Sequence, residues 1–208
     1  MNILRRIAAV ALTFAASSAF AQNTGSNTHF VVVAGLTGGG DTIATANFTN
    51  GDSENINAGA LLQFGAGLIW EVPNSPVAIQ VTANFHVSDS SSADNGSLKF
   101  SRFPLEAIAY YTDVPQWRFG VGMRATQSPV YKGRVKGSPS ESLDFKDAVG
   151  TILEAGYSFS PRAWVNVRYV SEKFQPTTYT LGGSSVNFTS DAKKVDGSHF
   201  GVSFLYQF

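Results

Sequence analysis

Apolar side chains fall on every second position along much of this chain. From 56 to 72 every even position is apolar, whereas the odd positions include Gln63 and Glu71. The same alternation runs through 77–88 and 117–126. Because successive side chains of a strand point to opposite faces, this period of two predicts strands with one apolar and one polar face.

The pattern predicts eight strands and no helix after the first 21 residues. The fourth strand contains Pro104, which predicts a bulge there because proline cannot donate a hydrogen bond to the ladder. The expected strands lie near residues 28–37, 55–71, 77–88, 98–111, 117–126, 145–159, 163–174 and 198–208.

Short and long connections alternate between these strands. The short ones read VPNSP, TDVPQ and SPRA, and the long ones cover about 38–54, 88–97, 127–144 and 175–197. Transmembrane barrels have this asymmetry, with short periplasmic turns and longer external loops. An even strand number also places both termini on the short-turn side.

Two of the long connections contain hairpin signals of their own. Gly182-Gly183 and Asn50-Gly51 are each flanked by strand-like residues, and such pairs favour tight β-turns. We therefore expect some strands to continue beyond the membrane as a protruding sheet.

Aromatic residues gather near the short turns. Trp70, Trp117 and Trp164 each lie within a few residues of one, and aromatic rings favour the membrane–water interface. A soluble lipocalin-like barrel has the same alternation with its apolar face inward. The loop asymmetry, the aromatic belt and the aromatic last strand favour the membrane barrel. Tyr110, Tyr111, Phe159, Tyr206 and Phe208 are expected in the same belt.

The polar face carries charged residues that suit the lumen of such a barrel. An eight-stranded barrel is just wide enough to be filled by side chains. Antiparallel pairing across the short turns places Glu106 beside Arg124 and Glu154 beside Arg168, so we expect a connected polar plug. The expected lumen network is Arg102, Glu106, Arg118, Arg124, Glu154, Arg168 and Glu172.

Composition narrows the class of protein. Charged residues make up 14% of the chain and there is no cysteine, which excludes disulfides and thiolate metal sites. Arg5 and Arg6 precede an apolar run and the site Ala19-Phe20-Ala21, the layout of a signal peptide for Sec-type export. Residues 1–21 are the expected signal peptide and residues 22–208 the barrel domain. The chain has no basic or acidic block, so we do not expect a nucleic-acid partner.

The export signal, strand count, loop asymmetry and ending FLYQF together resemble the small eight-stranded outer-membrane barrels of Gram-negative bacteria, the OmpA-, OmpX- and OmpW-like group. The stretches RFPLEAIAYY and WRFGVGMRAT are similar to these domains as well. The resemblance implies an all-β, antiparallel up-and-down transmembrane barrel in the outer membrane. It also implies that Phe204, Tyr206 and Phe208 form a signal for the barrel-assembly machinery.

Two kinds of function remain open: a non-enzymatic barrel that supports the envelope or presents its loops, and a narrow conduit for small or hydrophobic molecules. A lipid-modifying enzyme is a distant third, because His86-Val87-Ser88 has no carboxylate at a matching distance to orient the histidine. We expect no catalytic residue, cofactor or metal, and a monomer. The expected partners are outer-membrane lipids and lipopolysaccharide, whose phosphates could meet Lys132, Arg134 and Lys136.

Overall fold

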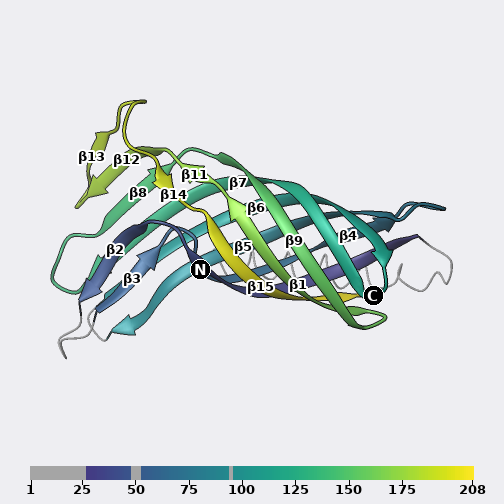
Figure 1. Ribbon diagram of the computed structural model, residues 1–208. Coiled ribbons are helices and arrows are strands. Elements are labelled where there is room, and N and C mark those ends of the chain that lie inside the picture. Colours follow the sequence, from purple (N-terminus) through teal and green to yellow (C-terminus); the bar gives the residue numbers. More distant parts are fainter. Residues whose placement is uncertain (1–26, 48–52, 94–95) are drawn as a thin grey trace.

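The computed structural model describes residues 27–47, 53–93 and 96–208, so the expected signal peptide at 1–21 lies outside the described residues. Eight antiparallel strands form a closed barrel, in which the first strand pairs with the last (Figure 1). The predicted fold class is confirmed. The barrel strands are β1(Thr28–Gly39), β4(Leu61–Glu71), β5(Val77–Ala93), β6(Gly96–Val114), β7(Trp117–Val135), β9(Ala148–Ser160), β10(Ala163–Ser171) and β15(His199–Gln207).

The three predicted short turns lie at one end of the barrel, on the right in Figure 1. They occupy residues 72–76, 115–116 and 161–162. Val31 near the start of β1 is opposite Gln207 at the end of β15, so both ends of the described barrel also lie on the short-turn side, as the even strand number requires.

The opposite end is built largely of strands where long loops were expected. β5 and β6 run through most of 88–97, and β7 continues to Val135. Smaller strands lie there as well. The barrel sheet is extended by β8(Glu141–Phe145), β12(Pro176–Leu181) and β13(Ser184–Asn187). Two separate two-stranded sheets are formed by β2(Thr42–Asn47) with β3(Ser53–Asn57) and by β11(Lys173–Phe174) with β14(Val195–Asp196). We call these strands, with the adjoining ends of β6 and β7, the loop-end extension.

The hairpin predicted at Gly182-Gly183 is present between β12 and β13. Both glycines have positive φ, +56° and +91°, a conformation that costs little only without a Cβ. β2 and β3 also form a hairpin, and the predicted turn at Asn50-Gly51 lies outside the described residues. The predicted protruding sheet is thus built on the β12–β13 hairpin and on β8, which pairs with β7.

One predicted strand is divided in two. The strand expected over 55–71 is interrupted at 58–60, where the chain leaves the sheet. Ala58 is fully buried there, and its N–H donates to the Asp41 carbonyl. Gly59 leaves no room for a side chain, since a Cβ would lie 2.7 Å from the Cβ of His199. Alternation alone missed this break because Ala58 keeps the apolar parity of the strand.

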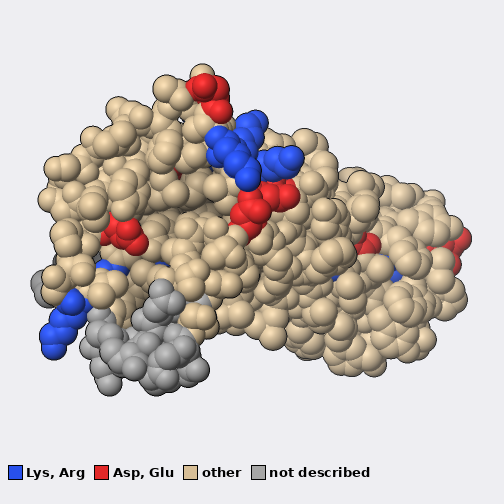
Figure 2. Space-filling view, turned by 60° about the vertical axis from the view of Figure 1, so that its left-hand side comes forward, with Lys and Arg blue, Asp and Glu red and all other residues tan. Residues whose placement is uncertain are grey.

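The barrel turns its apolar face outward and its polar face inward. Val121, Met123 and Val149, for example, are more than 60% exposed, and Figure 2 shows a wall between the two ends that is largely free of charge. The soluble alternative with an apolar interior is therefore wrong. The residues described include no helix long and apolar enough to cross a membrane, a finding that does not bear on crossing by strands.

Two buried apolar clusters lie at different heights inside. One contains residues near the short-turn ends of their strands, among them Val31, Ile69 and Leu205. The other belongs to the loop-end extension and contains Ile56, Ala58, Leu98, Phe100, Tyr131, Phe145, Ala148 and Phe174. Charged side chains occupy the space between these clusters.

Candidate functional site

The seven charged residues expected in the lumen all lie inside the barrel, and each is at most 5% exposed. Inward parity explains their placement, since they alternate with lipid-facing apolar residues on β6, β7, β9 and β10. Glu172 follows directly after β10. The seven are Arg102, Glu106, Arg118, Arg124, Glu154, Arg168 and Glu172.

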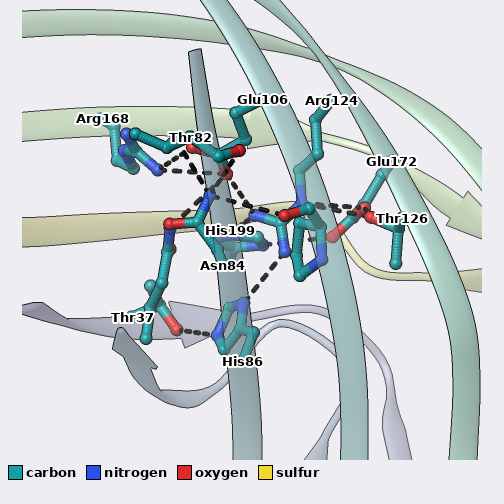
Figure 3. A network of polar contacts seen from close by, with 12 residues as sticks. Thr37, Thr82, Asn84, His86, Glu106, Arg124, Thr126, Arg168, Glu172 and His199 are labelled. Carbon is teal, nitrogen blue, oxygen red and sulfur yellow. Dashed lines mark hydrogen bonds and ion pairs between the residues drawn. The ribbon is translucent and has the colours of Figure 1, made fainter. Parts of the chain in front are cut away.

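Arg168 joins two carboxylates of this network. Its Nε donates to Glu154 Oε2 at 2.7 Å, and its Nη1 donates to Glu106 Oε2 at 3.0 Å (Figure 3). Arg124 donates to the other oxygen of Glu106 at 3.3 Å. Glu154 is the cross-strand neighbour of Arg168, and Glu106 that of Arg124. The structure therefore brings together both pairs expected from strand register.

Glu172 continues the network toward the loop-end extension. It accepts a hydrogen bond from Thr126 Oγ1 at 2.7 Å and pairs with Arg124 Nε at 3.4 Å. Its Oε1 lies 3.7 Å from Arg102 Nε. Arg102 lies under the rings of Phe100 and Phe174, at 5.1 and 5.6 Å. The loop-end apolar cluster thus closes the network on this side.

Two histidines belong to the network, although nothing in their spacing pointed to a shared site. His86 and His199 come from β5 and β15, and their rings are 5.2 Å apart. His86 Nδ1 lies 2.9 Å from Arg102 Nη2 and 3.0 Å from Arg124 Nη2. Since guanidinium groups only donate, this Nδ1 accepts, and Nε2–H donates to Thr37 Oγ1 at 2.7 Å. Inward parity was the one available signal for His86.

Arg118 lies at the short-turn end of the network and is bound differently. Its Nη2 donates to Asn166 Oδ1 at 2.9 Å but is 3.9 Å from Glu154. Its guanidinium lies over the rings of Tyr110 and Trp164, at 4.3 and 5.1 Å from their centres. Aromatic faces attract cations at such distances.

Two aromatic residues expected in the interface belt are therefore inside the barrel. Tyr110 is 1% exposed and donates its hydroxyl hydrogen to Glu154 at 2.7 Å. Trp164 packs against the apolar cluster nearest the short turns. A register irregularity between Ala163 and Trp164 accompanies this placement, and turn proximity alone does not fix the face of a strand. These two predictions were wrong.

The other expected interface residues face outward. Trp70 is 43% exposed and Trp117 is 44% exposed. Phe204 on β15 and Phe208 directly after it are exposed, and Tyr206 is half-buried against the ring of Phe208 at 4.9 Å. Their role as an assembly signal stays a prediction.

Inward-facing glycines make room for the large side chains of this interior, a role that alternation did not predict. A Cβ at Gly156 would lie 2.3 Å from Asn166 Oδ1 and 2.9 Å from Arg118 Nε. A Cβ at Gly120 would lie 2.7 Å from the ring of Tyr110. Both glycines therefore provide space for large side chains from neighbouring strands, which explains why glycine alternates with apolar residues on these strands.

The chemistry of this interior does not match a metal site. Across residues 27–47, 53–93 and 96–208, no three histidine or carboxylate side chains are grouped so as to hold a metal ion. The histidine nitrogens already face guanidinium groups, a hydroxyl or a backbone carbonyl. The arrangement fills the barrel cross-section with paired charges.

Comparison with solved structures gives fold similarities at low sequence identity. Neisserial surface protein A matches with a TM-score of 0.49 and 11% identity over 88% of this chain and 98% of that one. Ail of Yersinia pestis matches with a TM-score of 0.50 and 11% identity, covering 87% and 97%. AlkL, solved in lipid bilayers, matches with a TM-score of 0.46 and 19% identity, covering 90% and 94%.

Comparison with curated proteins gives no significant match. The family model of the outer membrane protein beta-barrel domain matches residues 7–208, nearly the whole chain. The match agrees with a closed barrel whose outer wall is apolar. The chain is therefore a small outer-membrane β-barrel and belongs to the outer membrane protein beta-barrel domain family.

Proposed function

We propose that this protein is a non-enzymatic, non-conducting barrel that supports the outer membrane and presents its loop-end extension outside the cell. The observation that carries the proposal is the continuous set of buried ion pairs across the barrel, from Glu154 through Arg168, Glu106 and Arg124 to Glu172. Apolar clusters lie on both sides of this set.

Such a plug opposes the passage of ions and solutes. Each charged group from Glu154 to Glu172 in this set is held by several partners, and a solute would have to break buried pairs whose separation is costly. The two interior histidines are held by hydrogen bonds and lie among the same side chains, which argues against a catalytic role. The extension offers exposed strands and hairpins for contact with other molecules.

Single-channel recording of the refolded protein in planar bilayers tests the plug. We expect no large steady conductance from the wild type. Glu154→Ala leaves Arg168 with one carboxylate partner and should produce intermittent openings. A large steady conductance of the wild type would reject the plug and favour the narrow conduit.

The proposed orientation has the short turns in the periplasm. A peptide tag inserted after Gly183, in the exposed β12–β13 turn, should be labelled on intact cells. A tag after Asn74, in the exposed turn between β4 and β5, should be labelled only after the outer membrane is opened. The reverse labelling pattern would show the opposite orientation.

Lipopolysaccharide is the proposed partner of the basic residues on the extension. Lys132, Arg134 and Lys136 are all exposed, on or just after β7, and phosphate groups form charge-assisted hydrogen bonds with such side chains. Replacing all three with glutamine should weaken lipopolysaccharide binding, whereas replacing the exposed Lys193 should not. Unchanged affinity of the triple variant would leave these residues as a solvated surface.

A further inference from the structure

The buried network has one positive charge more than its carboxylates can balance. Within the described part of the chain, the buried charged residues are Arg102, Arg118, Arg124 and Arg168 against Glu106, Glu154 and Glu172. The histidines do not change this count, because their hydrogen bonds fit the neutral form. His86 Nδ1 accepts from two arginines, and His199 Nδ1–H donates to the Gly197 carbonyl at 2.7 Å.

The surplus is located at Arg118. Glu154, its nearest carboxylate, already accepts from Tyr110 through Oε1 and from Arg168 through Oε2, both at 2.7 Å. The 3.9 Å that separate Arg118 Nη2 from Glu154 exceed hydrogen-bond distance. Among the described residues, the one acceptor bound to Arg118 is the neutral amide oxygen of Asn166. Arg118 Nε is buried and has no hydrogen-bond partner in the same part of the chain.

Arg102 is the other loosely paired arginine, but it differs in access. It is fully buried, and the rings of Phe100 and Phe174 cover it. Arg118, in contrast, lines a cavity of about 720 Å³ at the short-turn end of the barrel. This cavity opens on the short-turn side, and Arg118, which is 3% exposed, lies in its wall.

The walls of this cavity combine apolar and polar surface. Ile69, Ala78 and Trp164 supply apolar walls. Ser158 and Gln207 supply polar surface, and they already donate to the Ser160 carbonyl and to Glu71. Of the described residues that line the cavity, Glu71 is the other charged one, and it is exposed at the rim, where water screens its charge. A pocket of this kind suits a ligand with an apolar body and one polar group.

We propose that this cavity binds a small organic monoanion, a carboxylate on an apolar body, with Arg118 as its anchor. The carboxylate balances the surplus buried charge and lies within hydrogen-bond distance of the guanidinium, which no carboxylate of the described residues does. The apolar body lies against Ile69 and Ala78. The site is closed on its inner side by the charge network, so it is a dead-end pocket. Binding to Arg118 and conductance through the barrel are separate measurements, so one can fail without the other.

Calorimetric titration of the protein in lipid nanodiscs with benzoate tests this proposal, with empty nanodiscs as the blank. We expect saturable binding of one benzoate, and about tenfold weaker binding of benzyl alcohol, which lacks the charge. Arg118→Met keeps the length of the side chain and should weaken benzoate binding by about tenfold or more. Arg162→Met is the matched control, since Arg162 is exposed in the adjacent turn and should not affect binding.

A second variant keeps the test decisive if Arg118→Met fails to fold, which heat-dependent gel mobility would reveal. Ser158→Phe narrows the cavity and leaves Arg118 in place, and it should abolish benzoate binding. Absence of saturable binding to the wild type would overturn the proposal, as would unchanged binding by folded Arg118→Met or by Ser158→Phe.

Discussion

The barrel body and the loop-end extension place their apolar side chains on opposite sides of the same sheet. In the body, Val121 of β7 is 61% exposed and Arg124 is fully buried. In the extension, the same strand buries Tyr131 and exposes Lys132. The body therefore matches lipid outside and a polar interior, whereas the extension is organised like a water-soluble β-sheet. A single strand can follow both patterns if its alternation changes phase between them.

The phase changes at Ser128. Inward residues are even-numbered up to Thr126 and odd-numbered from Pro129 onward. Ser128 has a φ of +48°, and the pairing with β6 shifts register beside it. Its backbone N–H donates a hydrogen bond to Asp147 Oδ1 at 2.8 Å. A β-bulge of this kind re-aims the side chains that follow it, and here it converts a lipid-facing strand into a water-facing one.

The largest expected effect comes from breaking the centre of the charge network in the body. Arg168→Met removes the donor that joins Glu106 and Glu154, and breaking a buried pair on one side costs about 3–5 kcal/mol of unfolding free energy. Urea unfolding in lipid vesicles measures this loss. Arg118→Met makes the same change in net charge but breaks no carboxylate hydrogen bond, so its loss should be much smaller. Equal losses would show that the number of buried charges, and not their hydrogen bonds, determines the stability of the interior.

The second largest effect tests whether the extension can unfold while the barrel body stays folded. Phe100→Ala removes a ring that packs against Phe145 and Phe174 in the extension. Such a truncation costs about 3 kcal/mol where a core is well packed. We expect increased proteolysis within 136–147 and 175–197. The barrel body should stay folded and still change its gel mobility on heating. Unfolding of the whole barrel by this change would show that the two regions are one cooperative unit.

A charge on the outer surface should distinguish the solvents that the two regions face. Val121→Arg places a cation on the lipid-facing wall, where the cost is about 2–4 kcal/mol near the bilayer centre. Val186→Arg is the matched change on β13 of the extension, where Val186 is 66% exposed, and it should stay within about 0.5 kcal/mol. Unfolding of both variants in vesicles provides the comparison. A similar cost at Val186 would mean that the extension also faces lipid.

The smallest expected effect is a pH transition confined to the extension. Hydrogen bonds from the Ser198 hydroxyl and from its backbone N–H lower the pKa of Asp196. A carboxylate with a lowered pKa stabilises the fold above its unfolded value of about 3.9, and this contribution is lost as the pH falls through the folded value. The Ser198 amide resonance should therefore titrate below pH 3.9 or so, and Asp196→Asn should abolish the transition. A midpoint at or above the ordinary value would contradict the hydrogen-bond assignment.

Much of the barrel body could be predicted from local pattern alone. Alternation identified the barrel strands, and turn residues identified the three short connections. Because side chains alternate strictly, parity also placed Arg124, Glu154 and Arg168 on the inner face. Strand register across the short turns then brought Glu106 to Arg124 and Glu154 to Arg168. The phase change at Ser128 ends the recognisable alternation at Thr126, so alternation predicts a loop where β7 continues.

The sequence by itself determined which side chains share a face, because the period of a strand is a local property of the backbone. Only the tertiary structure decided which neighbours those faces meet. Closure of β1 onto β15 brings His199 to His86, and Trp164 turns inward onto Arg118 at an irregular position of β10. The oxygens of Glu154 accept from Tyr110 and Arg168, and Arg118 stays 3.9 Å from this carboxylate, beyond hydrogen-bond distance. These contacts join residues far apart in sequence across a confined space, and no local period encodes which of several buried donors reaches a given acceptor.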